Sequence, residues 1–274
     1  MPNERHPASM PGTMSAVIDR SAYEPVFAEA FDAPVLDESR WVPHYLPQWT
    51  TPDRSAARYE LHPGFLRLRI DADQPAWRPE DGQLRVSNLQ TGSFSGPPGA
   101  DRGTHRHRPD LVVRTPQPTR RLFTPTGGLV EARLRASTDP TVMLAIWLVG
   151  LEEESPQQSG EICIAELYGS RVGPGGSAVR TGIKAHGDPD LREDMADVDL
   201  PLDATDWHTY AAAWTADETR IYVDDELMRT LDQGTAYPLQ LMLDLFEFPA
   251  GRDRDPAAYP KHGDVAAVRG YRAR

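Results

Sequence analysis

Two glutamates, Glu161 and Glu166, are the residues whose type and spacing point most directly to chemistry. They lie five positions apart and enclose the apolar residues Ile-Cys-Ile-Ala. A pair of carboxyl groups can cleave a glycosidic bond, because one protonates the leaving oxygen while the other attacks carbon or activates water. The pair is therefore a candidate acid and nucleophile. The alternative is that both are ordinary acids facing solvent.

The spacing of this pair requires a distortion of the backbone. In a regular strand successive side chains point to opposite faces, so Glu161 and Glu166 would point apart. One extra residue in a β-bulge near Ile164 and Ala165 would turn Glu166 to the face of Glu161 and leave Ile162 and Ile164 facing the core. If this pair is catalytic, the strand that carries it must therefore contain a β-bulge.

Short strands joined by turns are the elements expected to position the pair. Alternating apolar and charged residues predict strands at 65–70 and 129–135. The apolar run 141–150 predicts a central strand covered on both faces, with a buried helix as the alternative. Further strands are expected at 207–215, 219–223, 239–246 and 265–271, with a turn at Asp224-Asp225. Without alternating helices, this pattern favours an all-β sandwich or barrel.

Composition and charge limit the possible partners. The 274 residues carry a formal net charge of -12 and include 26 prolines and 21 glycines. An acidic protein is a poor match for nucleic acid or an anionic membrane surface, so neither partner is expected. Cys163 is the only cysteine, which excludes an intrachain disulfide and a cysteine-based zinc site.

The chain is expected to hold one domain, residues 23–274, after a loosely packed leader at 1–22 that is rich in Pro, Ser and Met. The leader has no apolar run typical of a secretory signal, which predicts a cytoplasmic location, or an extracellular one if an exported parent has been trimmed. Two long excursions, 87–118 and 170–201, are expected to be functional loops. A monomer is expected.

Two histidines in the first excursion, His105 and His107, could bind a metal ion or phosphate. Their i, i+2 spacing is weak evidence, and the sequence offers no evident third ligand. We therefore interpret the stretch around them as a loop at the edge of the substrate site.

The acidic stretch resembles the Glu-x-Asp-x-x-Glu signature of glycoside hydrolase family 16, which includes laminarinases, lichenases and agarases. Cys163 stands at the position of the central aspartate. The resemblance extends over about residues 26–271. Its supporting matches are Phe27, Glu29, Phe31, Asp32, Asp37 and Trp41; Ile146-Trp147-Leu148; Ile183 to His186; and Trp207-His208-Thr209-Tyr210 with Trp214-Thr215 and Tyr222-Val223-Asp224.

This resemblance implies a fold and an activity. The fold would be a concanavalin A-like jelly-roll sandwich of two antiparallel sheets, with the substrate cleft on the concave face. The activity would be that of a retaining endo-acting β-glycosidase, a hydrolase or transglycosylase, on a β-glucan-like poly- or oligosaccharide. Glu161 would be the nucleophile and Glu166 the general acid/base, while Trp147 and His186 would border the sugar.

The residue between the glutamates keeps an alternative open. The family's aspartate bonds the nucleophile and helps to set its protonation, whereas the Cys163 thiol is a weak donor and acceptor with less negative charge. A carbohydrate-binding protein that has lost catalysis is therefore the alternative function.

Aromatic residues complete the expected site. Tyr168 follows the acidic stretch and Phe94 lies in a long excursion, so both are candidates for stacking on sugar rings, whereas Trp49 and Trp77 are expected in the core. No cofactor and no metal ligand are expected at the site. The family resemblance leaves a structural calcium possible, with no ligands assignable by motif.

Overall fold

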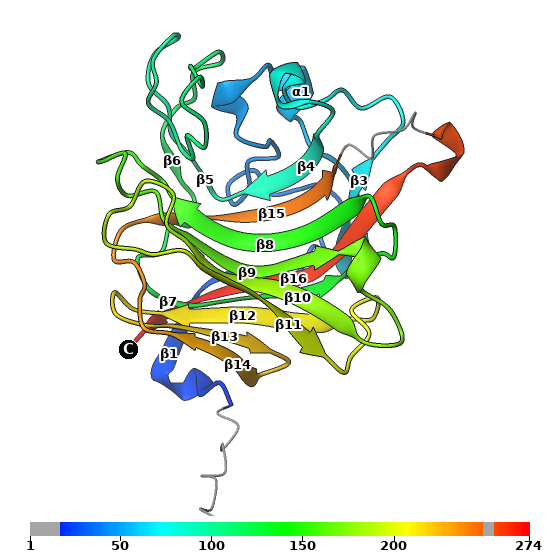
Figure 1. The fold of residues 1–274 in the computed structure, drawn as a ribbon, viewed down its shortest axis with the longest axis vertical. Coiled ribbons are helices and arrows are strands. Elements are labelled where there is room, and N and C mark those ends of the chain that lie inside the picture. Colours follow the sequence, from blue (N-terminus) through cyan, green and yellow to red (C-terminus); the bar gives the residue numbers. More distant parts are fainter. Residues whose placement is uncertain (1–16, 249–254) are drawn as a thin grey trace, which may run out of the picture.

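The protein is a sandwich of two antiparallel β-sheets, seen in a computed structural model that describes residues 17–248 and 255–274 (Figure 1). The larger sheet has the order β14 (Glu226–Leu231), β13 (Thr219–Val223), β12 (His208–Trp214), β7 (Gly128–Arg135), β16 (Lys261–Ala273), β3 (Phe65–Ile70) and β2 (Arg58–His62), and β1 (Tyr23–Glu29) also pairs with β16. The smaller sheet has the order β11 (Asp194–Leu200), β10 (Ser177–Lys184), β9 (Glu161–Tyr168), β8 (Val142–Gly150), β15 (Leu239–Glu247) and β4 (Arg85–Gln90). The expected all-β jelly-roll architecture is confirmed.

The remaining elements are short. A two-stranded ribbon pairs β5 (Gly92–Ser93) with β6 (Arg120–Arg121), and the described helices are α1 (Pro52–Ser55) and the 3₁₀ turns η1 (Arg20–Ala22), η2 (Pro47–Trp49), η3 (Pro79–Asp81), η4 (Gly169–Arg171) and η5 (Pro256–Ala258). Within the described ranges, no helix combines the length and apolarity needed to cross a bilayer.

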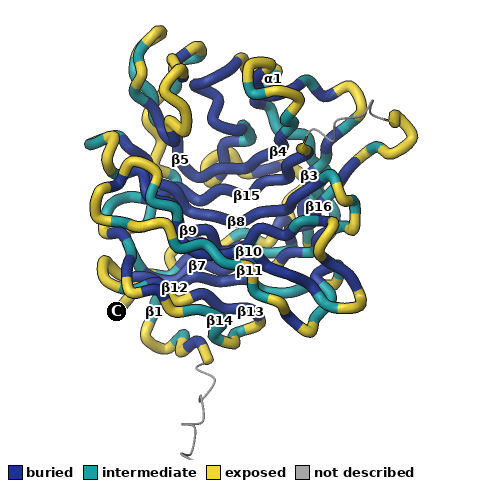
Figure 2. Tube along the Cα trace, viewed as in Figure 1, coloured by how far each residue is buried: buried dark blue, intermediate teal, exposed yellow. Residues whose placement is uncertain are grey.

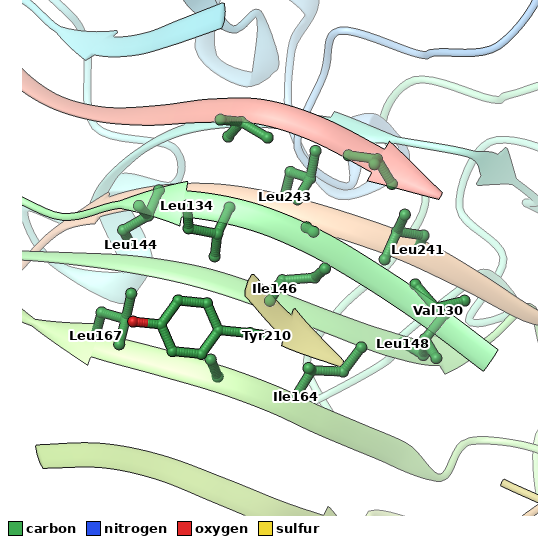
Figure 3. Close-up of a cluster of buried hydrophobic side chains, with 14 of the residues drawn as sticks. Val130, Leu134, Leu144, Ile146, Leu148, Ile164, Leu167, Tyr210, Leu241 and Leu243 are labelled. Carbon is green, nitrogen blue, oxygen red and sulfur yellow. The ribbon is translucent and has the colours of Figure 1, made fainter. Parts of the chain in front are cut away.

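The main core lies between the two sheets. Buried side chains from both inner faces interdigitate there (Figure 3), among them Val130, Leu134, Ile146, Leu148, Tyr210, Leu241 and Leu243. Burial is concentrated along the strands, and the exposed residues gather in the connecting loops (Figure 2). This core fixes the smaller sheet, whose opposite face carries the candidate site.

A second apolar cluster covers part of that opposite face. Trp49 and Trp77, with 0% and 1% of their surface exposed, pack there with Trp147 and Met242 from the sheet. Both tryptophans thus lie in a core, as expected. The cover explains why β8 is apolar on both faces, and the strand predicted at 141–150 is confirmed over the buried helix.

Most predicted strands lie within one or two residues of their expected bounds, and β16 is longer. The predicted turn at Asp224 and Asp225 connects β13 to β14, and both residues have positive φ, 47° and 70°. Two such residues in a two-residue connection match the twist of the flanking strands.

Three sequence-based expectations need correction. The excursion 87–118 begins inside β4, and 170–201 contains both β10 and β11. These strands carry glycine, small polar residues or acids in place of a strong apolar alternation. The leader predicted for 1–22 is also too long, because Ile18 is buried and Arg20 bonds Glu131. Residues 1–16 lie outside the described part.

Candidate active site

A bulge in β9 sets the geometry of the two glutamates. Opposite β8, Ala165 pairs with Ile146 and Cys163 with Trp147, so Ile164 is an extra residue. Opposite β10, the register shifts over the same residues of β9. Thr181 stabilises the distorted backbone by donating its hydroxyl to the carbonyls of Cys163 and Ile164, at 2.8 and 2.9 Å.

The bulge brings both acids to one face of the sheet. One carboxylate oxygen from each of Glu161 and Glu166 and the Cys163 sulfur all lie within 4.8 Å of one another. Ile162 and Ile164 are fully buried in the core between the sheets. The bulge predicted from the spacing of the acids is therefore confirmed.

Lys184 links the two glutamates. It lies directly opposite Glu161 in the pairing of β10 with β9. Its Nζ is 2.8 Å from Oε1 of Glu161 and 2.9 Å from Oε1 of Glu166. Burial disfavours the charged ammonium, but the two carboxylates outweigh burial and raise the pKa of Lys184 above its ordinary value. Lys184 is a fixed positive charge between the acids.

Glu161 is held as a carboxylate from two sides. Its Oε2 lies 2.8 Å from Nε2 of His186, while Oε1 accepts from Lys184. Burial alone would raise the pKa of Glu161, but the His186 hydrogen bond and the Lys184 charge outweigh it and lower that pKa. An ionised carboxylate in this position is suited to nucleophilic attack.

Glu166 has a different set of partners. Besides Lys184, its Oε2 accepts from the Tyr168 hydroxyl at 3.3 Å and lies 3.7 Å from Nε of Arg180. Burial and the Glu166 carboxylate raise the pKa of Tyr168 to about 12, so this hydroxyl remains a donor. The two glutamates therefore have different hydrogen-bond and charge partners. A general acid and a nucleophile need such different environments.

Cys163 lies between the acids but carries no charge. It is fully buried, and its thiol is 3.7 Å from the carbonyl oxygen of Arg180. Burial, followed by the charges of Glu166 and Glu161, raises the pKa of Cys163 well above its ordinary value. The thiol therefore supplies neither the charge nor the strong hydrogen bonds of an aspartate.

A cleft of about 280 Å³ opens above the acid pair. It is lined by Tyr45, Leu84, His105, Met143, Ala145, Trp147, Glu161, Glu166, Tyr168, Lys184, His186, Phe246 and Phe248. Tyr168 and Phe246 each stack on Phe248, with centroids 6.2 and 5.9 Å apart. This aromatic wall at the Glu166 side is suited to packing against the apolar face of a sugar ring.

Trp147 is fixed in the cleft by a buried acid. Its Nε1 donates to Oδ2 of Asp244 at 2.5 Å, from the neighbouring strand β15. Asp244 is fully buried, and burial raises its pKa well above the ordinary value. This hydrogen bond fixes the orientation of the Trp147 indole in the cleft.

A second pocket of about 370 Å³ adjoins the cleft. Its lining includes His105 and His186, which also line the cleft, together with Glu152 and Ser159. Burial raises the pKa of Glu152 to about 8. Burial, with the nearby His186 and His107, lowers the pKa of His105 well below its usual range, so its imidazole is neutral.

The structure brings together most of the predicted site residues. Trp147, Tyr168 and His186 line the cleft of the two glutamates. Phe94 does not line it: its ring lies against the guanidinium of Arg102, 5.7 Å away, in the segment between β5 and β6. Position in a long excursion was not sufficient reason to place Phe94 at the site.

His105 lines the cleft, as expected for a loop at the edge of the substrate site. Sequence reasoning missed Lys184, Tyr45, Asp244, Phe246 and Phe248 in and around the cleft. A signal existed for Lys184, because it precedes His186 by two residues and strand alternation places such residues on one face. A signal also existed for Asp244, because an acid inside an otherwise apolar stretch indicates a buried acid with a specific partner.

Two groups of residues could hold a metal ion in the described part of the chain. One consists of His105, Glu161 and His186, and the other of Glu161, Cys163 and Glu166. In each group the potential ligand atoms lie within 4.8 Å of one another. Both groups belong to this cleft, so a metal bound to either would contact the nucleophile candidate.

Comparisons with known proteins agree with this geometry. Residues 123–252 match the family model described as glycosyl hydrolases family 16. The structure is similar to a GlcNAcα1-4Gal-releasing endo-β-galactosidase from Clostridium perfringens, with 25% identity and a TM-score of 0.79. That match covers 93% of this chain but 64% of the other, so the chain spans less than two thirds of that protein.

Two laminarinases share the fold. One from Rhodothermus marinus has 20% identity and a TM-score of 0.65, covering 92% of this chain and 98% of its own. One from Flavobacterium sp. UMI-01 has 17% identity and a TM-score of 0.63, covering 91% and 100%. A comparison with curated protein sequences found no match.

Proposed function

We propose that this chain is a member of glycoside hydrolase family 16 and acts as a retaining, endo-acting β-glycosidase with Glu161 as nucleophile and Glu166 as general acid/base. The observation that carries the proposal is the bulge that turns two buried carboxyl groups to one face of β9. They lie at the floor of a cleft with an aromatic wall.

The separation of the acids favours retention over inversion. Retaining glycosidases place the two carboxyl groups about 5–5.5 Å apart, whereas inverting enzymes need about 6.5–9.5 Å to admit a water molecule. Oxygens of Glu161 and Glu166 lie within 4.8 Å of each other, a separation suited to direct attack on the sugar.

In the first step, Glu166 donates its proton to the glycosidic oxygen while the bond from that oxygen to C1 breaks. The Glu161 carboxylate forms a new bond to C1, giving a glycosyl ester.

In the second step, the Glu166 carboxylate takes a proton from water, whose oxygen attacks C1 and releases Glu161. While Glu161 is an ester it has no negative charge, so Lys184 interacts with Glu166 alone. This interaction stabilises the base form that the second step requires. A sugar hydroxyl in place of water would give transglycosylation.

The comparisons bear on the class of substrate and not on one particular glycan. The endo-β-galactosidase is more similar in structure than the two laminarinases, with TM-scores of 0.79 against 0.65 and 0.63. Galactose-containing β-linked glycans therefore need testing beside the β-glucans that the family resemblance implies.

The test uses a panel of β-galactans and β-glucans. We expect wild type to release reducing ends from at least one of them, and Glu161→Gln and Glu166→Gln each to lower kcat by about 10³-fold or more. Proton NMR of the first product should show the β-anomer. Release by wild type no greater than by Glu161→Gln, or an α-anomer, would contradict the proposal.

A binding protein without turnover is the second candidate, and one observation favours it. Lys184 contacts both glutamates, so an ammonium group lies against the carboxyl group that would have to donate the proton. The discriminating variant is Cys163→Asp, which restores the family's central acid. Activity found only in this variant, with oligosaccharide binding already present in wild type, would support the binding protein; loss of existing activity would exclude it.

A further inference from the structure

We propose that His105, Glu161 and His186 form a binding site for a divalent transition-metal ion such as Zn²⁺. The sequence offered His105 and His107 without an evident third ligand. The fold supplies two further ligands from elsewhere in the chain: Glu161 at the start of β9 and His186 just after β10. His107 is not part of this group.

The donor atoms suit such an ion. Two imidazole nitrogens and a carboxylate oxygen are ligands that Zn²⁺ commonly takes, with bonds of about 2.0–2.2 Å. Three protein ligands would leave a fourth position for water. Because the three atoms lie within 4.8 Å of one another, and tetrahedral ligands at such bond lengths are about 3.3 Å apart, shifts of about 1 Å would complete the site.

The two histidine rings already lie edge to face beside each other at the cleft. Their centroids are 4.8 Å apart at an angle of 80°. Both residues line the cleft and the adjoining pocket, so an ion reaches them from solvent. Among the described residues, the His105 ring has aromatic neighbours but no side-chain hydrogen bond, which leaves a nitrogen for an ion.

Local charge also accommodates the ion. Glu161 and Glu166 carry two negative charges when both are ionised, and Lys184 offsets one of them. The bound ion would replace the His186 hydrogen bond on Oε2 of Glu161 and leave the Lys184 bond on Oε1 in place. Arg180, 3.7 Å from Glu166, adds a second positive charge, so the attraction for a dication comes from the Glu161 carboxylate itself.

Metal binding would occupy the carboxylate that attacks the sugar. The ion would therefore inhibit turnover and compete with substrate for the cleft. Inhibition rests on the proposed function, whereas binding of the ion does not. A direct binding measurement therefore separates failure of the metal site from failure of the proposed activity.

The experiment titrates the purified protein with ZnCl₂ by calorimetry. His105 has φ of +55°, so His105→Asn is the suitable variant, because Asn tolerates the left-handed region. We expect one Zn²⁺ per chain and a Kd raised at least tenfold in His105→Asn. His107→Asn, the matched control, should bind as wild type does. No binding to wild type, or equal binding by His105→Asn with unchanged circular dichroism, would overturn the site.

Cobalt(II) distinguishes the two ligand groups. At the proposed site Co²⁺ would show visible bands without an intense near-ultraviolet band from thiolate. An intense band that is lost in Cys163→Ser would place the ion between Glu161, Cys163 and Glu166 and overturn the assignment. Wild-type Co²⁺ spectra retained in Cys163→Ser and lost in His105→Asn would support it, whether or not the protein cleaves any glycan tested.

Discussion

Lys184 is the residue whose replacement should most alter the ionisation of the acid pair. It contacts both glutamates, and with His186 it lowers the pKa of Glu161. A nucleophile with a lowered pKa stays ionised, and activity is lost as pH falls through that pKa. Lys184→Met removes the charge, so the pKa of Glu161 should rise and the acidic limb of kcat/KM should move to higher pH.

The expected fall in kcat for Lys184→Met is roughly 10²-fold, the usual cost of losing one preorganised donor at a reacting group. Lys184→Arg keeps the charge and should retain the wild-type limb with a smaller loss of kcat. A pH–rate profile of the three proteins is the measurement. A higher kcat in Lys184→Met would mean that Lys184 suppresses the general acid, contrary to the mechanism.

At this scale the sequence predicted the reacting pair better than its surroundings. Glu161 and Glu166 stand in one short stretch, so their chemistry could be inferred from spacing. Lys184 and Asp244 reach the site from other strands, and strand register depends on pairing across the sheet. That pairing leaves no local pattern in the sequence.

At the scale of elements, Asp264 connects three neighbouring strands of the larger sheet. From β16 it accepts from Nε of Arg67 on β3 at 2.7 Å and from Nη2 of Arg135 on β7 at 2.5 Å. Burial would raise the pKa of Asp264, but the two guanidinium groups outweigh it and lower that pKa. Such a group stabilises the fold above its unfolded pKa of about 3.9, and the contribution is lost as pH falls below that.

We expect Asp264→Asn to lower the free energy of unfolding at pH 7 by roughly 2–4 kcal/mol. This is somewhat less than for a fully buried pair, because both arginines are partly exposed. Urea unfolding at pH 7 and below pH 4 is the test, and the deficit should shrink at the lower pH. Asp73→Asn removes an exposed partner of Arg58 and should leave the free energy of unfolding almost unchanged, because water screens this pair. Equal effects of the two variants would contradict the role of Asp264.

The elements also show where sequence patterns succeed. Residues 65–70 form a strand with the predicted bounds, since alternation there reflects one buried face. The hairpin strand at 219–223 also has its predicted bounds. The same rule missed β10 and β11. In β10 small and polar residues face the acid pair, and β11 is an edge strand rich in aspartate. Strands shaped by a site or an edge lack the usual pattern.

At the scale of the whole molecule, residues 17–22 connect the start of the described chain to the larger sheet. Ile18 packs with Leu129 and Tyr222, and its N–H donates to the carbonyl of Asp225. Arg20 lies 2.7 Å from Glu131, whose side chain is only 3% exposed. These contacts cover the outer face of β7, β12 and β13, so this segment belongs to the folded domain.

Two deletions test that assignment. A protein that starts at residue 17 keeps these contacts, whereas one that starts at residue 23 loses Ile18 and leaves Glu131 without its guanidinium partner at 2.7 Å. We expect the shorter protein to be less stable by about 2–4 kcal/mol, from the burial of one aliphatic side chain and a partly exposed ion pair. Thermal unfolding of both should give a lower Tm for the shorter protein. Arg20→Ala in the longer one should reproduce part of the loss, and equal Tm values for the two deletions would mean that the domain is complete without residues 17–22.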